Sequence, residues 1–237
     1  MATEGTGESE EAKEEKPAAK GANDKNENKT AEKKISKGDF IEIEFTGKEK
    51  ETNQVFDATA EKPAIVCVGQ QHVIRGLDDS FVGRRVGDSY RVYIMPEQGF
   101  GRKDAKLLQL ISTSKFTEQN IRPSPGLVVN IDGMMGTVRT VTGGRTVVDF
   151  NHPLASREIF YDVKIRKIIE NPGEKLRALI SIRTGIEPEL SLDEGIAEAR
   201  LPVKLPDSIE KLIFEEAREF IPGIKIINFS VVKKEKN

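Results

Sequence analysis

The sequence predicts an α+β fold in which an antiparallel half-barrel sheet wraps around a short helix. Apolar and polar residues alternate in three stretches, residues 40–45, 90–94 and 159–165. This period of two is typical of strands with one buried and one solvated face. Between the first two stretches, Ile74 and Leu77 lie at helical spacing before Gly83, and we expect a short helix there that packs on the sheet.

The segment before the first predicted strand has a different composition. Residues 1–36 contain no aromatic side chain, and Ile35 is their only branched aliphatic. Such a segment buries too little apolar surface to offset the entropy of ordering the chain. We predict that residues 1–36 form a disordered charged tail, which serves either as a solubilising extension or as an interaction segment.

The stretch 102–150 predicts an inserted all-β domain. Asp132-Gly133 and Gly143-Gly144 each separate short runs rich in Val and Ile, a pattern typical of tight hairpins. The apolar residues of this stretch exceed what so small a domain buries easily, so they fill its own core or form a binding surface. They are Leu107, Leu108, Leu110, Ile111, Phe116, Leu127, Met134 and Met135.

Residues 171–237 predict a C-terminal α/β domain after a linker at Asn171-Pro172-Gly173. We expect a strand at 179–182, a short helix that begins near Ser191, a helix at 207–220 opened by an Asp207–Glu210 capping box, and a last strand at 227–231. The apolar face of the long helix needs a partner, which is either its own strands or a second copy of the chain, so a homodimer through this domain stays open.

Composition excludes several classes of function. A chain of 237 residues has room for more than one domain, and its 37 basic and 39 acidic side chains nearly cancel, so no global field favours nucleic acid. A lone cysteine, Cys67, forms no internal disulfide and is expected as buried filler. The N-terminus has no apolar run that would direct the chain to a membrane, and we expect a cytoplasmic protein.

The candidate site residues point to chemistry by shape and desolvation. His72 and His152 are the only histidines and lie far apart in sequence, so we expect no metal site. Gly143-Gly144-Arg145 lacks the strand, helix and lysine of a phosphate loop, so we expect no nucleotide and no other cofactor. Apolar and aromatic residues instead recur among turn glycines, with no nucleophile beside them.

Six short motifs follow one another in a fixed order: Lys37-Gly38-Asp39, Phe45-Thr46-Gly47, Val55-Phe56-Asp57, Val73-Ile74-Arg75-Gly76-Leu77, Val86-Gly87-Asp88 and Phe100-Gly101. This ordered set resembles the FKBP-type peptidyl-prolyl cis-trans isomerases. The interruption after Gly101 and the return through residues 148–155 resemble the SlyD-like branch, which carries an insert-in-flap chaperone domain. The resemblance divides the chain into an isomerase domain at 37–101 and 151–170, the insert at 102–150, and an accessory domain at 171–237 like that of long archaeal members.

The resemblance implies an enzyme that binds Xaa-Pro in an apolar groove and accelerates rotation about the preceding amide. It implies four catalytic residues, Phe45, Asp57, Phe100 and Tyr161, and four substrate-binding residues, Phe56, Val73, Ile74 and Leu77. Phe45 and Phe100 stand where the family often has Tyr, and Leu77 where it often has Trp. Singly, each aromatic could equally be core, and Asp57 could cap its own turn.

The expected partners are proline-containing unfolded or partly folded polypeptides, held by the apolar surface of the insert. We also keep a second hypothesis from another class, a noncatalytic holdase or scaffold that retains the fold. A peptide isomerisation assay separates the two hypotheses.

Overall fold

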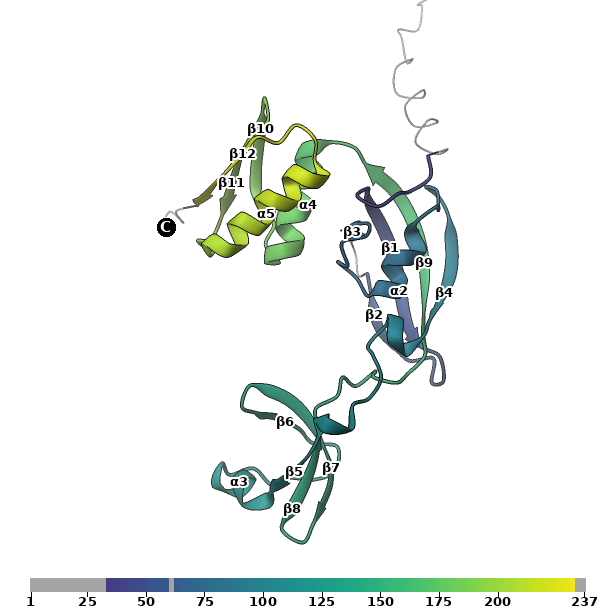
Figure 1. Cartoon of the computed structure of the whole chain (residues 1–237), viewed down its shortest axis with the longest axis vertical. Coiled ribbons are helices and arrows are strands. Elements are labelled where there is room, and N and C mark those ends of the chain that lie inside the picture. The colour runs from purple at the N-terminus through teal and green to yellow at the C-terminus, as the bar shows by residue number, and fades with distance from the viewer. Residues whose placement is uncertain (1–32, 60–61, 233–237) are drawn as a thin grey trace, which may run out of the picture.

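The computed structural model describes residues 33–59 and 62–232. Three sheets divide them into a central, an inserted and a C-terminal unit, and the latter two join opposite ends of the central unit (Figure 1). Among the described residues, no helix has both the length and the apolar character needed to cross a membrane. The predicted disorder of residues 1–32 lies outside the described residues.

The central sheet confirms the predicted fold class. Its path runs β2 (Val55–Ala58), β1 (Phe40–Glu49), β9 (Ile159–Ile169) and β4 (Ser89–Ile94), with β3 (Ala64–Cys67) also paired to β1, and every pairing is antiparallel. The short helix α2 (Arg75–Phe81) buries Leu77 and Phe81 against this sheet. The alternation in the sequence thus separates a core face from an outer face.

The first residues of the fold differ from the sequence prediction. Ile35, assigned above to the tail, is 1% exposed and packs in the core of the central unit. Its amide donates to the Arg84 carbonyl at 2.8 Å, and its own carbonyl accepts from the Gly83 amide at 2.8 Å. The prediction was wrong at this residue because burial of a single isoleucine and two backbone hydrogen bonds are enough to order it. These leave no periodic pattern in the sequence.

The inserted unit holds a four-stranded sheet ordered β5 (Leu108–Ser112), β8 (Arg145–Asp149), β7 (Met134–Thr142) and β6 (Val128–Ile131). Both predicted hairpins are confirmed, and their turn residues have positive φ. The all-β prediction needs one correction, because α3 (Thr113–Glu118) buries Phe116 in the core of this unit. Two 3-10 turns, η1 (Pro96–Gln98) and η2 (Ala105–Leu107), lie on the path into the insert.

The C-terminal unit has helices α4 (Pro172–Thr184) and α5 (Asp207–Phe220) and a sheet ordered β10 (Glu189–Asp193), β11 (Ile196–Leu201) and β12 (Ile226–Val231). Helix α5 and strand β12 occur where predicted. The apolar face of α5 packs within this unit, with Ile213 and Ala217 fully buried, so it needs no second copy of the chain.

Four predictions in this region were wrong. Residues 179–182 belong to helix α4, because Leu176, Leu179 and Ile180 form one buried helical face. The expected linker opens that helix, since the Asn171 side chain accepts from the Glu174 amide at 3.1 Å. The expected short helix near Ser191 is instead the β10–β11 hairpin, turned at Glu194-Gly195. The capping box is absent from the described α5, whose cap is Pro206 without a side-chain hydrogen bond.

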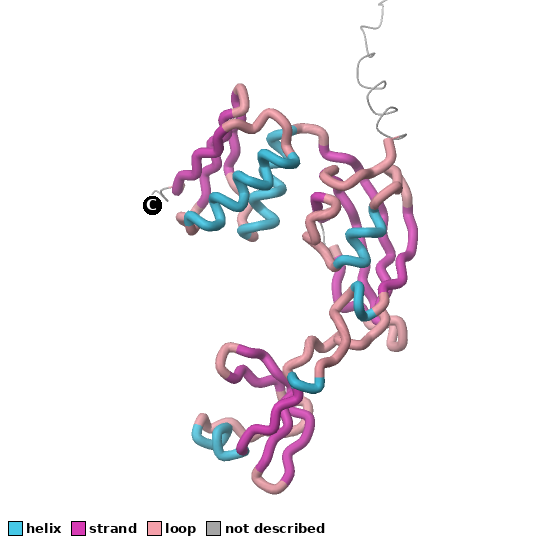
Figure 2. The backbone as a smooth tube through the Cα atoms, viewed as in Figure 1, coloured by secondary structure: helices cyan, strands magenta, loops and turns pink. Residues whose placement is uncertain are grey.

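The central and C-terminal units share a core. Phe40, Cys67 and Ile169 of the central sheet are buried in the same apolar cluster as Leu176 and Leu179 of α4. The inserted unit has its own cluster and is reached through two loop segments, drawn in pink in Figure 2. The C-terminal unit is therefore packed on the central sheet, whereas the insert is tethered to it.

Candidate functional site

A cavity of about 660 Å³ opens beside α2, on the core side of the central sheet. Seven of the eight predicted site residues line it, and the eighth, Phe56, packs on two of them. The sequence-predicted residues therefore do converge on one cavity. The lining comprises Phe45, Asp57, Ala64, Ile65, Val66, Gln71, His72, Val73, Ile74, Leu77, Phe100, Tyr161 and Ile182.

Four aromatic rings cluster at this cavity: Phe45, Phe100 and Tyr161 line it, and Phe56 packs on the last two. Tyr161 meets Phe45 and Phe56 edge to face, with ring centroids 5.5 and 5.7 Å apart, and Phe56 meets Phe100 in the same way at 5.7 Å. Edge-to-face pairs hold each other's orientation. Gly47 lies opposite Tyr161 in the β1–β9 register, and its missing side chain leaves room for the Tyr161 and Phe56 rings.

One carboxylate stands at the rim of the ring wall. The Tyr161 hydroxyl donates to Asp57 Oδ2 at 3.3 Å. Burial, and then the charge of Asp57, raises the pKa of Tyr161 above its ordinary value, so the hydroxyl stays protonated and remains a donor. Within the described residues, the hydrogen bond that Asp57 accepts is the one from Tyr161.

The loop that carries Val73 and Ile74 is held by a buried carboxylate that sequence reasoning missed. Asp78 accepts from the amides of Gly69 and Gln71, both at 2.9 Å, and its side chain is almost fully buried. Buried carboxylates that accept backbone N–H groups fix loops firmly. The sequence gives a weak signal for this role, since Asp78 directly follows Leu77 of the matched motif.

A second hollow of about 560 Å³ adjoins the first, shares Asp57 and Phe100 with it, and is also lined by Phe56. His152 lines this hollow and stacks on Phe100, with parallel rings and centroids 4.3 Å apart. Because His152 lies in the segment that returns from the insert, this stacking connects the insert boundary to the aromatic wall. Sequence reasoning considered His152 only as a metal ligand.

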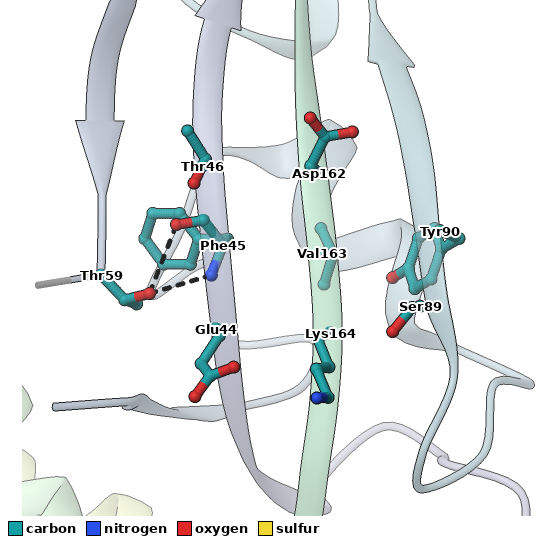
Figure 3. Close-up of a pocket in the computed structure, with 9 residues that line it drawn as sticks. All are labelled: Glu44, Phe45, Thr46, Thr59, Ser89, Tyr90, Asp162, Val163 and Lys164. Carbon is teal, nitrogen blue, oxygen red and sulfur yellow. Dashed lines mark hydrogen bonds between the residues drawn. The ribbon is translucent and has the colours of Figure 1, made fainter. Parts of the chain in front are cut away.

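A third hollow, of about 600 Å³, lies on the outer face of the central sheet (Figure 3). Successive side chains of a strand point to opposite faces, so most of the predicted site residues lie on the core face. Among them, only Phe45 lines this hollow, and its backbone amide and carbonyl are both hydrogen-bonded to the Thr59 hydroxyl (Figure 3). Asp162 in this hollow is paired with Arg91 by two hydrogen bonds of 2.7 and 3.0 Å. The charge of Asp162 is thus already compensated.

Two buried titratable groups on the β3 side of the cavity, His72 and Cys67, are neutral. Burial lowers the pKa of His72, and its Nδ1 accepts from the Cys67 amide at 3.2 Å, so the neutral ring carries its proton on Nε2. Cys67 is fully buried, as predicted, and burial raises the pKa of its thiol to about 12. Within residues 33–59 and 62–232, no group of three or more His, Cys, Asp or Glu is placed to hold a metal ion.

Comparison with known proteins agrees with this geometry. Residues 31–118 match the family described as FKBP-type peptidyl-prolyl cis-trans isomerase, and residues 109–154 match the family described as FKBP26, IF domain. The chain is 29% identical over 147 residues to the short-type peptidyl-prolyl cis-trans isomerase of Methanocaldococcus jannaschii, covering 56% of this chain and 94% of that protein.

Bacterial relatives show the same similarity. The probable FKBP-type 16 kDa isomerase of Pseudomonas fluorescens is 30% identical over 141 residues, covering 57% of this chain and 92% of that protein. The SlyD isomerase of Aeromonas hydrophila is 28% identical over 146 residues, covering 60% of this chain and 68% of that protein. The chain therefore belongs to the FKBP-type peptidyl-prolyl cis-trans isomerases and is an enzyme of that class, a rotamase.

Proposed function

We propose that this isomerase binds an Xaa-Pro segment in the 660 Å³ cavity and stabilises the twisted amide without covalent chemistry. The observation that supports this most directly is the wall of edge-to-face rings around an open cavity with a single carboxylate at its rim. Family membership favours this enzyme over the noncatalytic holdase.

The physical chemistry of the amide explains why such a cavity suffices. Rotation about the amide has a barrier of ~18–20 kcal/mol because resonance gives the C–N bond partial double-bond character. Twisting removes the resonance and with it much of the charge separation of the planar amide. An apolar wall that excludes water therefore favours the twisted form over the planar one. No proton transfer is needed.

In this proposal the rings of Phe45, Phe56 and Phe100 exclude water, Val73 and Ile74 close the side, and Leu77 forms the floor. Asp57 and Tyr161 form the polar rim. Phe45 and Phe100 each lack a hydroxyl that the family often has, and one neutral hydrogen bond contributes ~0.5–1.5 kcal/mol, a factor of about two to twelve in rate. This reduces turnover without abolishing it.

A protease-coupled assay on a short proline peptide tests the site. Asp57→Leu should lower kcat/KM strongly with the fold intact, because Asp57 faces the cavity. Asp162→Leu is the matched control, since Asp162 is a partly exposed strand carboxylate on the outer face. Equal losses in both variants would contradict the assignment, and a parent without rate enhancement would support the noncatalytic alternative.

We propose further that the insert acts as a chaperone that captures unfolded, proline-containing chains for the isomerase site. Five large apolar side chains of this unit are strongly exposed: Leu108 at 46%, Leu110 at 57%, Val128 at 58%, Met134 at 46% and Met135 at 60%. Phe116, Ile111 and Leu127 fill the unit's own core. Exposed Met and Leu side chains adapt to many apolar partners, and a tethered capture site raises the local substrate concentration.

Two variants test this division of labour. Removal of residues 103–150 should leave isomerisation of a short peptide intact and slow the catalysed refolding of a proline-limited protein. The double variant Leu108→Ser/Leu110→Ser should slow the catalysed refolding in the same way but to a smaller extent. The control is Ile196→Ser/Ile226→Ser, which removes similarly exposed side chains from the C-terminal unit and should leave the catalysed refolding unchanged. Equal loss on peptide and protein substrates would refute the capture role.

A further inference from the structure

The isomerase cavity contains one residue that comes from outside the central unit. Ile182, near the end of α4 in the C-terminal unit, lines the same cavity as Ala64, Ile65 and His72. Helix α4 packs on β3, the strand that carries Ala64 and Ile65 (Figure 1). The wall of the cavity on this side is therefore built by two units.

The position of α4 against β3 is fixed by the shared core. Phe40 and Cys67 of the central sheet are fully buried in one cluster with Leu176, Leu179 and Ile180 of α4. Moving the helix away would expose these side chains to water, at a cost of ~25 cal/mol per Å² of apolar surface. The shared core thus holds the helix that carries Ile182 against the central sheet.

The lining on this side is apolar and uncharged. Ala64 has a small side chain, and Ile65 and Ile182 are half-buried aliphatics. Arg183, the next residue of α4, has its guanidinium bound by the Glu216 carboxylate at 2.9 Å and so offers no free charge to the cavity. His72 contributes a neutral ring whose Nε2 is buried and lacks a hydrogen-bond partner among the described residues. Such a lining suits an apolar side chain and disfavours a charged one.

We propose that Ile182 is a specificity-determining residue, which makes the C-terminal unit part of the substrate site and selects an apolar side chain next to the proline. The inference rests on the proposed prolyl cavity, since the selected residue must lie beside the bound proline. Because Ile182 contacts the flanking residue and not the amide that rotates, it should affect KM for some substrates more than kcat for all.

The test uses the full chain and proline tetrapeptides in which the residue before or after proline is Ala, Leu or Lys. The parent should favour Leu over Lys at one of these positions. Ile182→Ala removes three carbon atoms and should lower kcat/KM for the Leu peptide at least about fourfold, the factor for one buried methylene group, mainly through KM, and leave the Ala peptide unchanged. Ile186→Ala is the matched control, because Ile186 is also half-buried in this unit but does not line the cavity.

A second variant protects the test against simple loss of folding. Ile182→Glu should raise kcat/KM for the Lys peptide relative to the Leu peptide, a gain that a misfolded chain would not show. Equal effects of either variant on all peptides, or no effect on any, would overturn the role of Ile182 while leaving the prolyl cavity in place. A parent inactive on every peptide would instead overturn the cavity itself, and this inference with it.

Discussion

Gly47→Ala tests whether the positions of the cavity rings govern the rate. A Cβ at residue 47 would lie 2.8 and 2.9 Å from Cε1 and Cζ of Tyr161, and 3.0 Å from Cζ of Phe56. Carbon atoms in contact prefer ~3.5–4.0 Å, so both rings must retreat by roughly 0.5–1 Å. The added methyl group thus displaces Tyr161, which lines the cavity, and Phe56, which packs on it, although residue 47 itself does not line the cavity.

Both stability and rate should respond. Overpacking of this kind costs about 1–3 kcal/mol in the free energy of unfolding. Because the Tyr161–Asp57 hydrogen bond is already 3.3 Å long, displacement of the ring breaks it. A displacement near 1 Å in a reacting geometry costs up to about a hundredfold. We expect kcat/KM on a short proline peptide to fall about ten- to hundredfold in this variant.

The control is Gly173→Ala in the first turn of α4, where the nearest atom to an added Cβ is Asn171 Oδ1 at 3.1 Å, far from the rings. This variant should keep the parental kcat/KM. Unfolding by urea and the protease-coupled assay give the two readouts. A Gly47→Ala enzyme that retains its secondary structure and at least half of the parental kcat/KM would refute the reasoning.

Three further outcomes are expected. Tyr161→Phe should lower kcat/KM about two- to twelvefold, the factor that corresponds to one neutral hydrogen bond. The control, Tyr90→Phe, removes only a hydrogen bond to Ser80 and should keep the parental kcat/KM. Equal activity of the two variants would contradict a role of the Tyr161 hydroxyl in the reaction. Burial works to raise the pKa of Asp149, but hydrogen bonds from Asn151 and Arg139 outweigh it and hold the pKa below its ordinary value. Its carboxylate therefore stabilises the insert above about pH 4, and this contribution is lost as pH falls through the folded pKa. Urea unfolding of Asp149→Asn should show lower stability at pH 7 and a flatter acid dependence; an unchanged acid dependence would contradict this. Cys67, buried and with a thiol pKa of about 12, should resist a thiol reagent at pH 8 until urea unfolds the chain, and rapid native labelling would show that the shared core opens.

The sequence predicted the secondary structure correctly where one face of an element is buried and the other is exposed to solvent. Residues Ile41, Ile43, Tyr161 and Val163 alternate because the central sheet has a core face and an outer face, and this pattern located β1, β4 and β9. β2 and β3 were not predicted, since four residues are too few to establish a period. The fixed order of the motifs then brought together residues that are distant in sequence.

The C-terminal unit was harder to predict for a physical reason. Residues 179–182 form a short apolar run that reads equally as a strand or as a buried helix, and only packing decides between them. The helix expected to begin near Ser191 is absent from the described residues, because positive φ values at Glu194 and Gly195 form a hairpin turn instead. The place of Ile182 at the cavity could not be predicted at all, because it depends on how α4 packs on β3 and leaves no local pattern.

The shared apolar core has a consequence for thermal melting, because Phe40, Cys67 and Ile169 of the central unit lie in one cluster with α4. Segments that bury each other's side chains unfold as a single foldon, whereas a tethered module with its own small core can open alone. A calorimetric scan of the chain should therefore show two endotherms, an early one for the insert and a later one for the central and C-terminal units together. A chain truncated after residue 170 would expose Phe40, Cys67 and Ile169 to solvent and should become prone to aggregation.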